Sequence, residues 1–128
     1  WFLAGSEDVR SSFALEVSAT EFECQGLELD WVGVCWGGDL IPSENGDGWE
    51  YRRFRGSNWQ RCRSVEEQAY IRNRYRVLLT RARSGMVIWV PEGDKSDLTR
   101  DPDRFDRIFQ HIRTAGVPEM NPDEVFVL

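Results

Sequence analysis

An arginine-rich segment with helical spacing, residues 73–83 (NRYRVLLTRAR), constrains this chain more than any other part of the sequence. Four of its eleven residues are arginine, while apolar side chains recur at Tyr75, Leu78, Leu79 and Ala82. This spacing predicts an amphipathic helix that packs on one side. Because a guanidinium binds phosphate with two parallel hydrogen bonds, a packed helix with fixed arginines is suited to face phosphate.

Basic side chains are concentrated in one window, although the chain of 128 residues has a net charge of −6. Residues 52–83 hold ten of the sixteen basic side chains, all of them arginine, and only two acids, Glu66 and Glu67. The preference for arginine over lysine indicates recognition of phosphate or carboxylate. The alternative is that these arginines pair with acidic residues of the same domain.

Length and composition predict a single domain over residues 1–128. The chain begins at Trp1 without a methionine, and we expect it to be a fragment of a larger protein. No apolar run is long enough for a membrane helix, so no membrane partner is expected. Three distant cysteines and one histidine match no zinc spacing, which predicts free thiols, no metal site and a reducing, cytoplasmic location.

Hydrophobic patterns predict alternating strands and helices. Strands are expected at residues 13–19, 31–36, 86–90 and 125–128, the second of them buried on both faces. One helix is expected from the capping box Ser64–Glu67 to a stop at Gly85, and another from Asp101 to Gly116. The order predicts an α/β fold, a mostly parallel sheet flanked by helices, with an arginine- and aromatic-rich insertion at residues 42–63.

Two segments resemble helicase motifs. Residues 20–28 (TEFECQGLE), followed by the apolar run 31–36, are similar to motif V of superfamily 1 DNA/RNA helicases. Residues 75–83, followed by residues 86–90, resemble motif VI of the same enzymes. Over about residues 13–91 the sequence most resembles the C-terminal part of the Schlafen group 3-like DNA/RNA helicase domain, a family of poorly defined function.

The resemblance implies the second RecA-like lobe of a P-loop NTPase, with ATP and magnesium bound between two lobes. Arg81 corresponds to the catalytic arginine finger and to a nucleotide-binding residue. Glu28 is implied near the ribose or the lobe boundary, and Gln25 and Gly26 shape the same turn. Polar groups beyond the end of a strand at residue 19 would also suit a ligand site, whereas an ordinary loop is the alternative.

Nucleic-acid contacts are expected at two places. The resemblance puts Thr20 on the side of the DNA or RNA strand, and Phe22 stands where many members have histidine. Independently, aromatic residues interleave with Arg52, Arg53 and Arg55, a combination that suits a single strand. The alternative is an inserted hairpin whose aromatic side chains pack while its arginines meet acidic loops.

The sequence contains no GxxxxGK[ST] phosphate loop, so the chain alone is expected to be inactive as a hydrolase. An N-terminal ATPase lobe of the same protein is the expected partner. The main rival is a nucleic-acid-binding module without an ATPase role. A metal-dependent nuclease and a purely structural interaction domain are further alternatives, the nuclease being built on four acids whose spacing fits no known pattern: Glu21, Glu28, Asp30 and Asp39.

Overall fold

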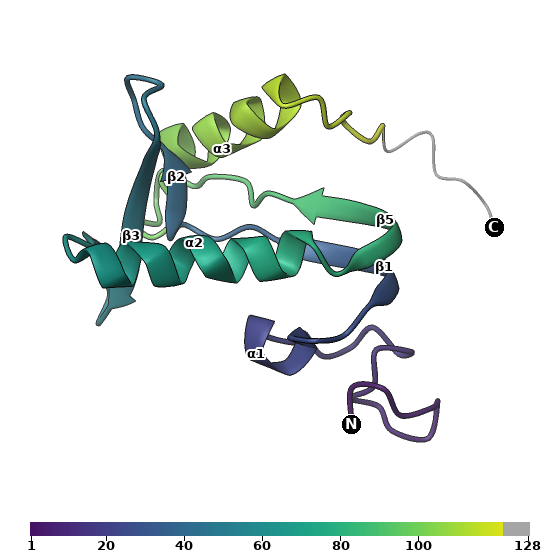
Figure 1. Cartoon of the computed structure of the whole chain (residues 1–128). Coiled ribbons are helices and arrows are strands. Elements are labelled where there is room, and N and C mark those ends of the chain that lie inside the picture. The colour runs from purple at the N-terminus through teal and green to yellow at the C-terminus, as the bar shows by residue number, and fades with distance from the viewer. Residues whose placement is uncertain (122–128) are drawn as a thin grey trace. The chain divides into compact units, whose positions relative to one another are not determined.

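The computed structural model describes residues 1–121, which fall into two compact units (Figure 1). Unit 1 comprises Trp1–Val34 and Ala69–Ile88, and unit 2 comprises Cys35–Gln68 and the chain from Trp89 onward. The expected strand at 125–128 lies outside the described residues, and a single domain over 1–128 stays a prediction. None of the helices in residues 1–121 has the length and apolar character needed to cross a membrane.

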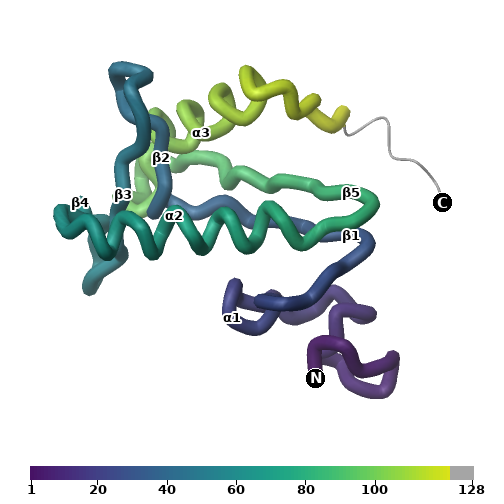
Figure 2. The backbone as a smooth tube through the Cα atoms, in the orientation of Figure 1, coloured from purple at the N-terminus to yellow at the C-terminus, as the bar shows by residue number. Residues whose placement is uncertain are grey.

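Unit 1 is built around a crossover between two parallel strands. The elements are α1 (Glu21–Cys24), β1 (Leu29–Cys35), α2 (Val65–Leu79) and β5 (Ala82–Trp89). β1 and β5 form a two-stranded sheet, in which the Leu29 amide donates to the Arg81 carbonyl at 2.9 Å. Just beyond β1, within unit 2, the Trp36 amide donates to the Trp89 carbonyl at 2.9 Å. Because the partners rise together in number, the strands are parallel. In the view of Figure 2, α2 runs roughly along the direction of β1.

The expected strand at residues 13–19 is wrong, because this segment forms turns. The Ala14 amide donates to Ser11 at 3.1 Å, and Leu15 has a left-handed backbone with φ 56. Phe13 and Leu15 are both exposed. Alternation alone does not make a strand without a neighbouring strand to pair with, and the local turn hydrogen bonds satisfy the backbone instead.

β1 was expected to be buried on both faces, and this is also wrong. Val34 is buried, but the Trp31 side chain is 72% exposed. Residues 31, 33 and 35 on one face of β1 are exposed, whereas residues 32 and 34 on the other face are half-buried and buried. Trp31 instead lies against Gly85 of β5, where an added Cβ would overlap the indole ring.

α2 ends earlier than expected, at Leu79 instead of near Gly85. The Thr80 hydroxyl donates to the Arg76 carbonyl at 2.7 Å, which closes the last turn. Residues from Ala82 onward then pair with β1, so that strand pairing and not the glycine sets the end of the helix. Arg81 consequently lies in the short link between α2 and β5.

Unit 2 is a three-stranded antiparallel sheet with one helix. β2 (Leu40–Pro42), β3 (Trp49–Arg55) and β4 (Asn58–Arg61) follow in that order, and α3 (Pro102–Thr114) packs against β2. Asp101 caps α3 and Pro102 is its first residue, as the sequence predicts. The unit's core includes Ile41, Phe105 and Ile108.

The insertion expected at residues 42–63 lies largely in this sheet, and its second half is the β3–β4 hairpin. Gly56 in the turn has φ +61, a backbone conformation that glycine adopts readily. The α/β class and a small parallel sheet are confirmed. A mostly parallel sheet is not, since within residues 1–121 more strands lie in the antiparallel sheet.

Candidate functional site

The structure brings Arg81 against the turn that contains Gln25, Gly26 and Glu28. The Arg81 guanidinium donates from Nη1 to the Leu27 carbonyl at 3.1 Å. Its Nε donates to the Val77 carbonyl at 3.1 Å and its Nη2 to the Thr80 hydroxyl at 3.2 Å. A guanidinium has five N–H donors, so this half-buried side chain is held in place with donors to spare.

The turn itself is open to solvent. Gln25, Gly26 and Glu28 are exposed, and Gly26 has φ +82. The turn and Arg81 precede β1 and β5, so they lie at the amino ends of these strands. The expectation that they follow the end of a strand is therefore wrong, because no strand forms at residues 13–19.

α1 is fixed by its own cap and by one acid. The Glu23 carboxylate accepts from the Thr20 amide at 2.7 Å and from its hydroxyl at 3.0 Å. Glu21 accepts from Arg74 Nε at 2.9 Å and from the Tyr70 hydroxyl at 3.3 Å. These contacts tie α1 to α2, a function of Glu21 that the sequence does not reveal.

The two expected nucleic-acid contacts of this segment remain accessible. Thr20 is exposed at the start of α1. Phe22 is exposed as well and has a ring centroid 6.2 Å from that of Tyr70, in a tilted arrangement. Both stay predictions, together with the assigned roles of Arg81, Gln25, Gly26 and Glu28.

The hairpin arginines divide between two faces, because neighbouring side chains in a strand point to opposite sides. Arg52 lies opposite Arg61 and Phe54 opposite Trp59, so these four share a side with Glu50. We call these five residues the Glu50 face. Arg53 lies opposite Gln60 on the other side, which also carries Arg55 and, next to it, Arg63 and Glu67. We call these five residues the Glu67 face.

On the Glu50 face Arg52 is part of the folded structure, whereas the Arg61 side chain is 65% exposed. Glu50, 8% exposed, pairs with Arg52 at 2.9 Å, with Arg61 at 3.4 Å and with Arg107 of α3 at 3.4 Å. Burial would raise the pKa of Glu50, but hydrogen bonds and charge from Arg52 and Arg107 outweigh it and hold that pKa below its ordinary value. Trp59 donates to the Thr99 carbonyl at 2.9 Å.

Arg52 therefore differs from the other two hairpin arginines predicted to bind nucleic acid. Its side chain is 16% exposed and already paired, whereas that of Arg53 is 46% exposed. The arrangement around Arg52 matches the alternative in which the arginines pair within the domain. The side chains of Arg53 and Arg55 are exposed to solvent and remain accessible to a ligand. The cluster around Glu50 was missed, although the i, i+2 spacing of Glu50 and Arg52 in a strand-like segment was a usable signal.

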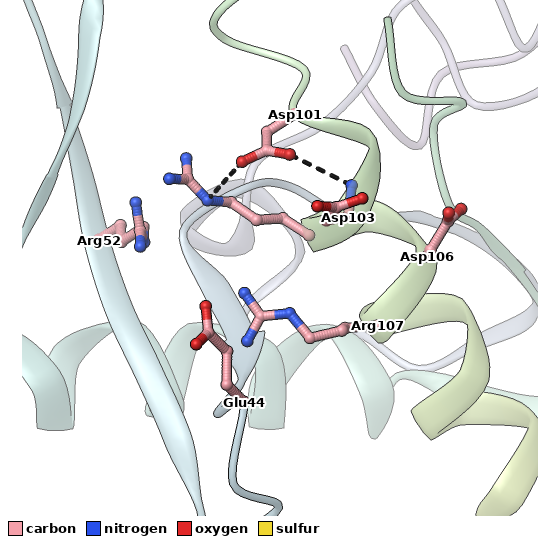
Figure 3. Close-up of a pocket in the computed structure, with 7 residues that line it drawn as sticks. Glu44, Arg52, Asp101, Asp103, Asp106 and Arg107 are labelled. Carbon is pink, nitrogen blue, oxygen red and sulfur yellow. Dashed lines mark hydrogen bonds and ion pairs between the residues drawn. The ribbon is translucent and has the colours of Figure 1, made fainter. Parts of the chain in front are cut away.

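A hollow of about 390 Å³ beside Arg52 has mixed charge (Figure 3). Its lining combines three arginines with four acids: Arg52, Arg104, Arg107, Glu44, Asp101, Asp103 and Asp106. Arg104 pairs with Asp101 at 3.1 Å. The arginines here are matched by carboxylates, so this hollow has no surplus of positive charge for an anion.

Cys24 and Cys62 are buried, Cys35 is exposed, and all three are free thiols. Burial raises the pKa of Cys24 and of Cys62, which keeps these thiols protonated. Residues 1–121 contain no group of three or more His, Cys, Asp or Glu side chains that could hold a metal ion. The four acids of the nuclease alternative are thus not gathered into such a group.

Comparison with known families gives one match. Residues 1–92 match the family model described as the Schlafen group 3, DNA/RNA helicase domain. The matched range includes α1, β1, the β3–β4 hairpin, α2 and β5, and excludes α3. Searches of curated proteins and of solved structures found no significant match.

Proposed function

Because this chain belongs to the Schlafen group 3 DNA/RNA helicase domain family, we propose that it forms the second RecA-like lobe of an ATP-dependent DNA or RNA helicase or translocase. The observation that supports the proposal is the contact between Arg81 and the Leu27 carbonyl. It joins the two segments that resemble motifs V and VI at one place, at the amino ends of two parallel strands.

In this proposal Arg81 is the arginine finger. Its backbone follows a helix and begins a strand, and three of its side-chain donors are already fixed to the protein. The remaining donors can bind phosphoryl oxygens without a large loss of side-chain entropy. Charge develops on those oxygens as the bond to the γ-phosphate breaks, and a guanidinium placed there stabilises it.

The exposed turn provides the second nucleotide contact. The Glu28 carboxylate can accept a ribose hydroxyl, and Gly26 allows the backbone between Gln25 and Glu28 to turn sharply. These residues fit one half of an ATP site. The phosphate loop and the acids that hold magnesium come, in this proposal, from an N-terminal lobe, because the sequence contains no GxxxxGK[ST] segment.

The test is the ATPase rate of the protein that joins this chain to its ATP-binding lobe. We expect Arg81→Ala to lower kcat by about 10³–10⁵, with KM for ATP changed much less. Arg81→Lys keeps the charge but loses the fork, so it is expected to recover little of the rate.

The matched control is Arg83→Ala, two residues further along. Arg83 is exposed, and its one ion pair within residues 1–121 is a 3.9 Å contact with Asp30. Its substitution is expected to leave kcat within about twofold. An Arg81→Ala protein that folds normally, as judged by its circular dichroism, and hydrolyses ATP at the wild-type rate would disprove the arginine finger.

A nucleic-acid-binding module without an ATPase role is the second candidate, favoured by the open arginines of the Glu67 face. It predicts salt-sensitive binding of single strands by the chain alone and no effect of Arg81→Ala on any ATPase. Both candidates include nucleic acid as a ligand, and the kcat of the Arg81 variants distinguishes them.

A further inference from the structure

The Glu67 face is a hollow in which arginines outnumber acids. Arg53 Nη2 lies 2.7 Å from the Glu67 carboxylate, and Arg55 Nη2 lies 3.8 Å from the same oxygen. Arg63 is exposed, and none of the described residues pairs with it. Together with Gln60 these side chains line a hollow of about 240 Å³. The hollow thus has three guanidinium groups and one carboxylate, which pairs with two of them.

We propose that the Glu67 face binds the phosphates of single-stranded nucleic acid and that Glu67 is an internal competitor for this site. The Glu67 carboxylate occupies the arginines when the strand is absent, and a phosphate replaces it when the strand binds. This inference rests on the proposed function for its ligand class, but it does not depend on Arg81 or on ATP.

The chemistry of the two anions explains the exchange. Carboxylate and phosphate both accept paired hydrogen bonds from a guanidinium, so they compete for the same donors. The exchange is easy because the Arg53–Glu67 pair is exposed to water and therefore weak. Each phosphate of a strand carries one negative charge, as the carboxylate does, but a strand presents several phosphates in a row and can therefore contact all three arginines.

The strand geometry suits a polymer better than a single ion. Arg53 and Arg55 lie two residues apart on β3, a separation of about 6.8 Å along the strand. Neighbouring phosphates of an extended single strand have a similar spacing, so each arginine can take its own phosphate. Gln60, opposite Arg53, offers amide groups that can bind sugar or base edges without strict sequence preference.

The first experiment measures binding of fluorescein-labelled oligodeoxythymidine and oligouridine to the full 128-residue chain by fluorescence anisotropy at several salt concentrations. The variant carries Arg53→Ala, Arg55→Ala and Arg63→Ala. The slope of log K against log salt is negative, and loss of three phosphate contacts on a single strand is expected to reduce its magnitude by about 2. The affinity at low salt falls accordingly.

The control removes the same charge elsewhere. Arg10, Arg100 and Arg113 are exposed arginines, each paired with an acid, as Arg53 and Arg55 are. The triple alanine variant at these positions is expected to keep the wild-type slope. Equal losses in the two triple variants, or no loss in the first, would overturn the proposal.

The second experiment tests Glu67 against its neighbour. Glu67→Gln is expected to tighten binding by up to about fivefold, which corresponds to the full strength of an exposed ion pair. Glu66→Gln removes the same charge from the same helical turn. The Glu66 carboxylate accepts a hydrogen bond from the Ser64 hydroxyl, and within the described residues no contact joins it to the hairpin. Equal effects of the two variants would show that Glu67 is no specific competitor.

Two competitors distinguish other anions. Displacement of the oligonucleotide by ATP at the same concentration of phosphate groups would identify a free nucleotide as the ligand and overturn the proposal. Preferential displacement by polyglutamate would identify an acidic protein and overturn it as well. Neither competitor is expected to match an unlabelled oligonucleotide.

The outcomes also separate this inference from the proposed function. If Arg81→Ala abolishes ATP hydrolysis while the hairpin variant binds strands normally, only the Glu67 face is refuted. If the hairpin variant loses binding while Arg81→Ala hydrolyses ATP at the wild-type rate, only the ATPase lobe is refuted.

Discussion

The Glu50 face and the Glu67 face carry arginines from the same seven-residue strand, yet the two carboxylates lie in different surroundings. The Glu50 side chain is 8% exposed and binds arginines from β3, β4 and α3. The Glu67 side chain is 30% exposed, and the arginines it pairs with among the described residues are Arg53 and Arg55 of β3. Burial makes the first set of contacts structural and leaves the second set exchangeable.

This difference shows why the density of arginine does not by itself identify a binding surface. Arg52 and Arg53 are neighbours in sequence and chemically identical, but strand alternation sends them to opposite faces. An ion pair removed from water cannot lose one partner without leaving a charge in a poorly solvated place. A pair in water can exchange its anion, so Arg53 and Arg55 can bind a ligand in a way that Arg52 cannot.

The largest effect that separates the faces is expected from Glu50→Ala. The substitution leaves Arg52 and Arg107 poorly solvated and without their carboxylate, which should lower the free energy of unfolding by about 3 kcal/mol. Urea denaturation of the whole chain measures the change as a lower midpoint. Glu67→Gln is the comparison and should cost less than about 1 kcal/mol, since its ion pairs are exposed.

Equal destabilisation by Glu50→Ala and Glu67→Gln would break the comparison. It would mean that the Glu67 contacts hold the hairpin as firmly as those of Glu50, and the exchange proposed for the Glu67 face would have no basis. Tryptophan fluorescence can follow the unfolding of this sheet, because β3 and β4 each contain a tryptophan.

Local sequence signals predicted the elements that carry their own caps or uninterrupted apolar runs. α3 begins as expected because the Asp101 side chain accepts from the Asp103 amide at 3.2 Å and Pro102 follows directly. The strand expected at 31–36 forms because its apolar run is strand-like throughout. These signals act within a few residues, so they can be read from the sequence.

The failures all involve partners that are distant in sequence. Residues 13–19 alternate like a strand, but no strand within residues 1–121 pairs with them. Gly85 lies inside β5 because that segment pairs with β1. Glu67, expected to complete a capping box, accepts instead from Arg53 of the hairpin, while the Ser64 hydroxyl still accepts from the Glu67 amide at 3.3 Å. Such tertiary contacts override local preference.

The candidate site could be predicted as a set of segments but not as a geometry. The resemblance to motifs V and VI led to Arg81 and Glu28, and the contact between Arg81 and Leu27 brings the two segments together. The i, i+2 spacing of Glu50 and Arg52 places these two on one face of a strand, but no spacing in the sequence indicates which face is buried. The Glu50 cluster needs Arg107, which is 57 residues away.

A smaller effect is expected in the pH dependence of stability. The pKa of Glu50 in the folded chain lies below its ordinary value of 4.5, because the hydrogen bonds and charges of its arginines outweigh burial. Its contribution to stability is therefore complete above that value and is lost as the pH falls through the lowered pKa. Glu50→Gln removes this titration, so the stability gap between wild type and variant should shrink from about pH 6 to about pH 3.

Other carboxylates also change the stability at low pH, but they are present in both the wild type and Glu50→Gln. Hydrogen bonds lower the pKa of Asp8 and of Asp97 to about 2 each, mainly from the side chains of Arg10 and Thr99 respectively. Since wild type and Glu50→Gln share them, they cancel in the difference. A gap that stays constant over the whole range would show that Glu50 gains nothing from its ionised form.

The smallest effect is the coupling between Arg53 and Glu67, and it decides whether the Glu67 face can act as proposed. A double-mutant cycle with Arg53→Ala and Glu67→Gln is expected to give about 0.2–1 kcal/mol, decreasing with added salt. The cycle with Arg52→Ala and Glu50→Gln should give a larger coupling that depends less on salt, because those side chains are shielded from the solvent. A phosphate must overcome the coupling to Glu67 before it gains anything from Arg53. If that coupling equalled the one on the Glu50 face, Glu67 would be a permanent partner of the hairpin, and the ligand of these arginines would already be part of the fold.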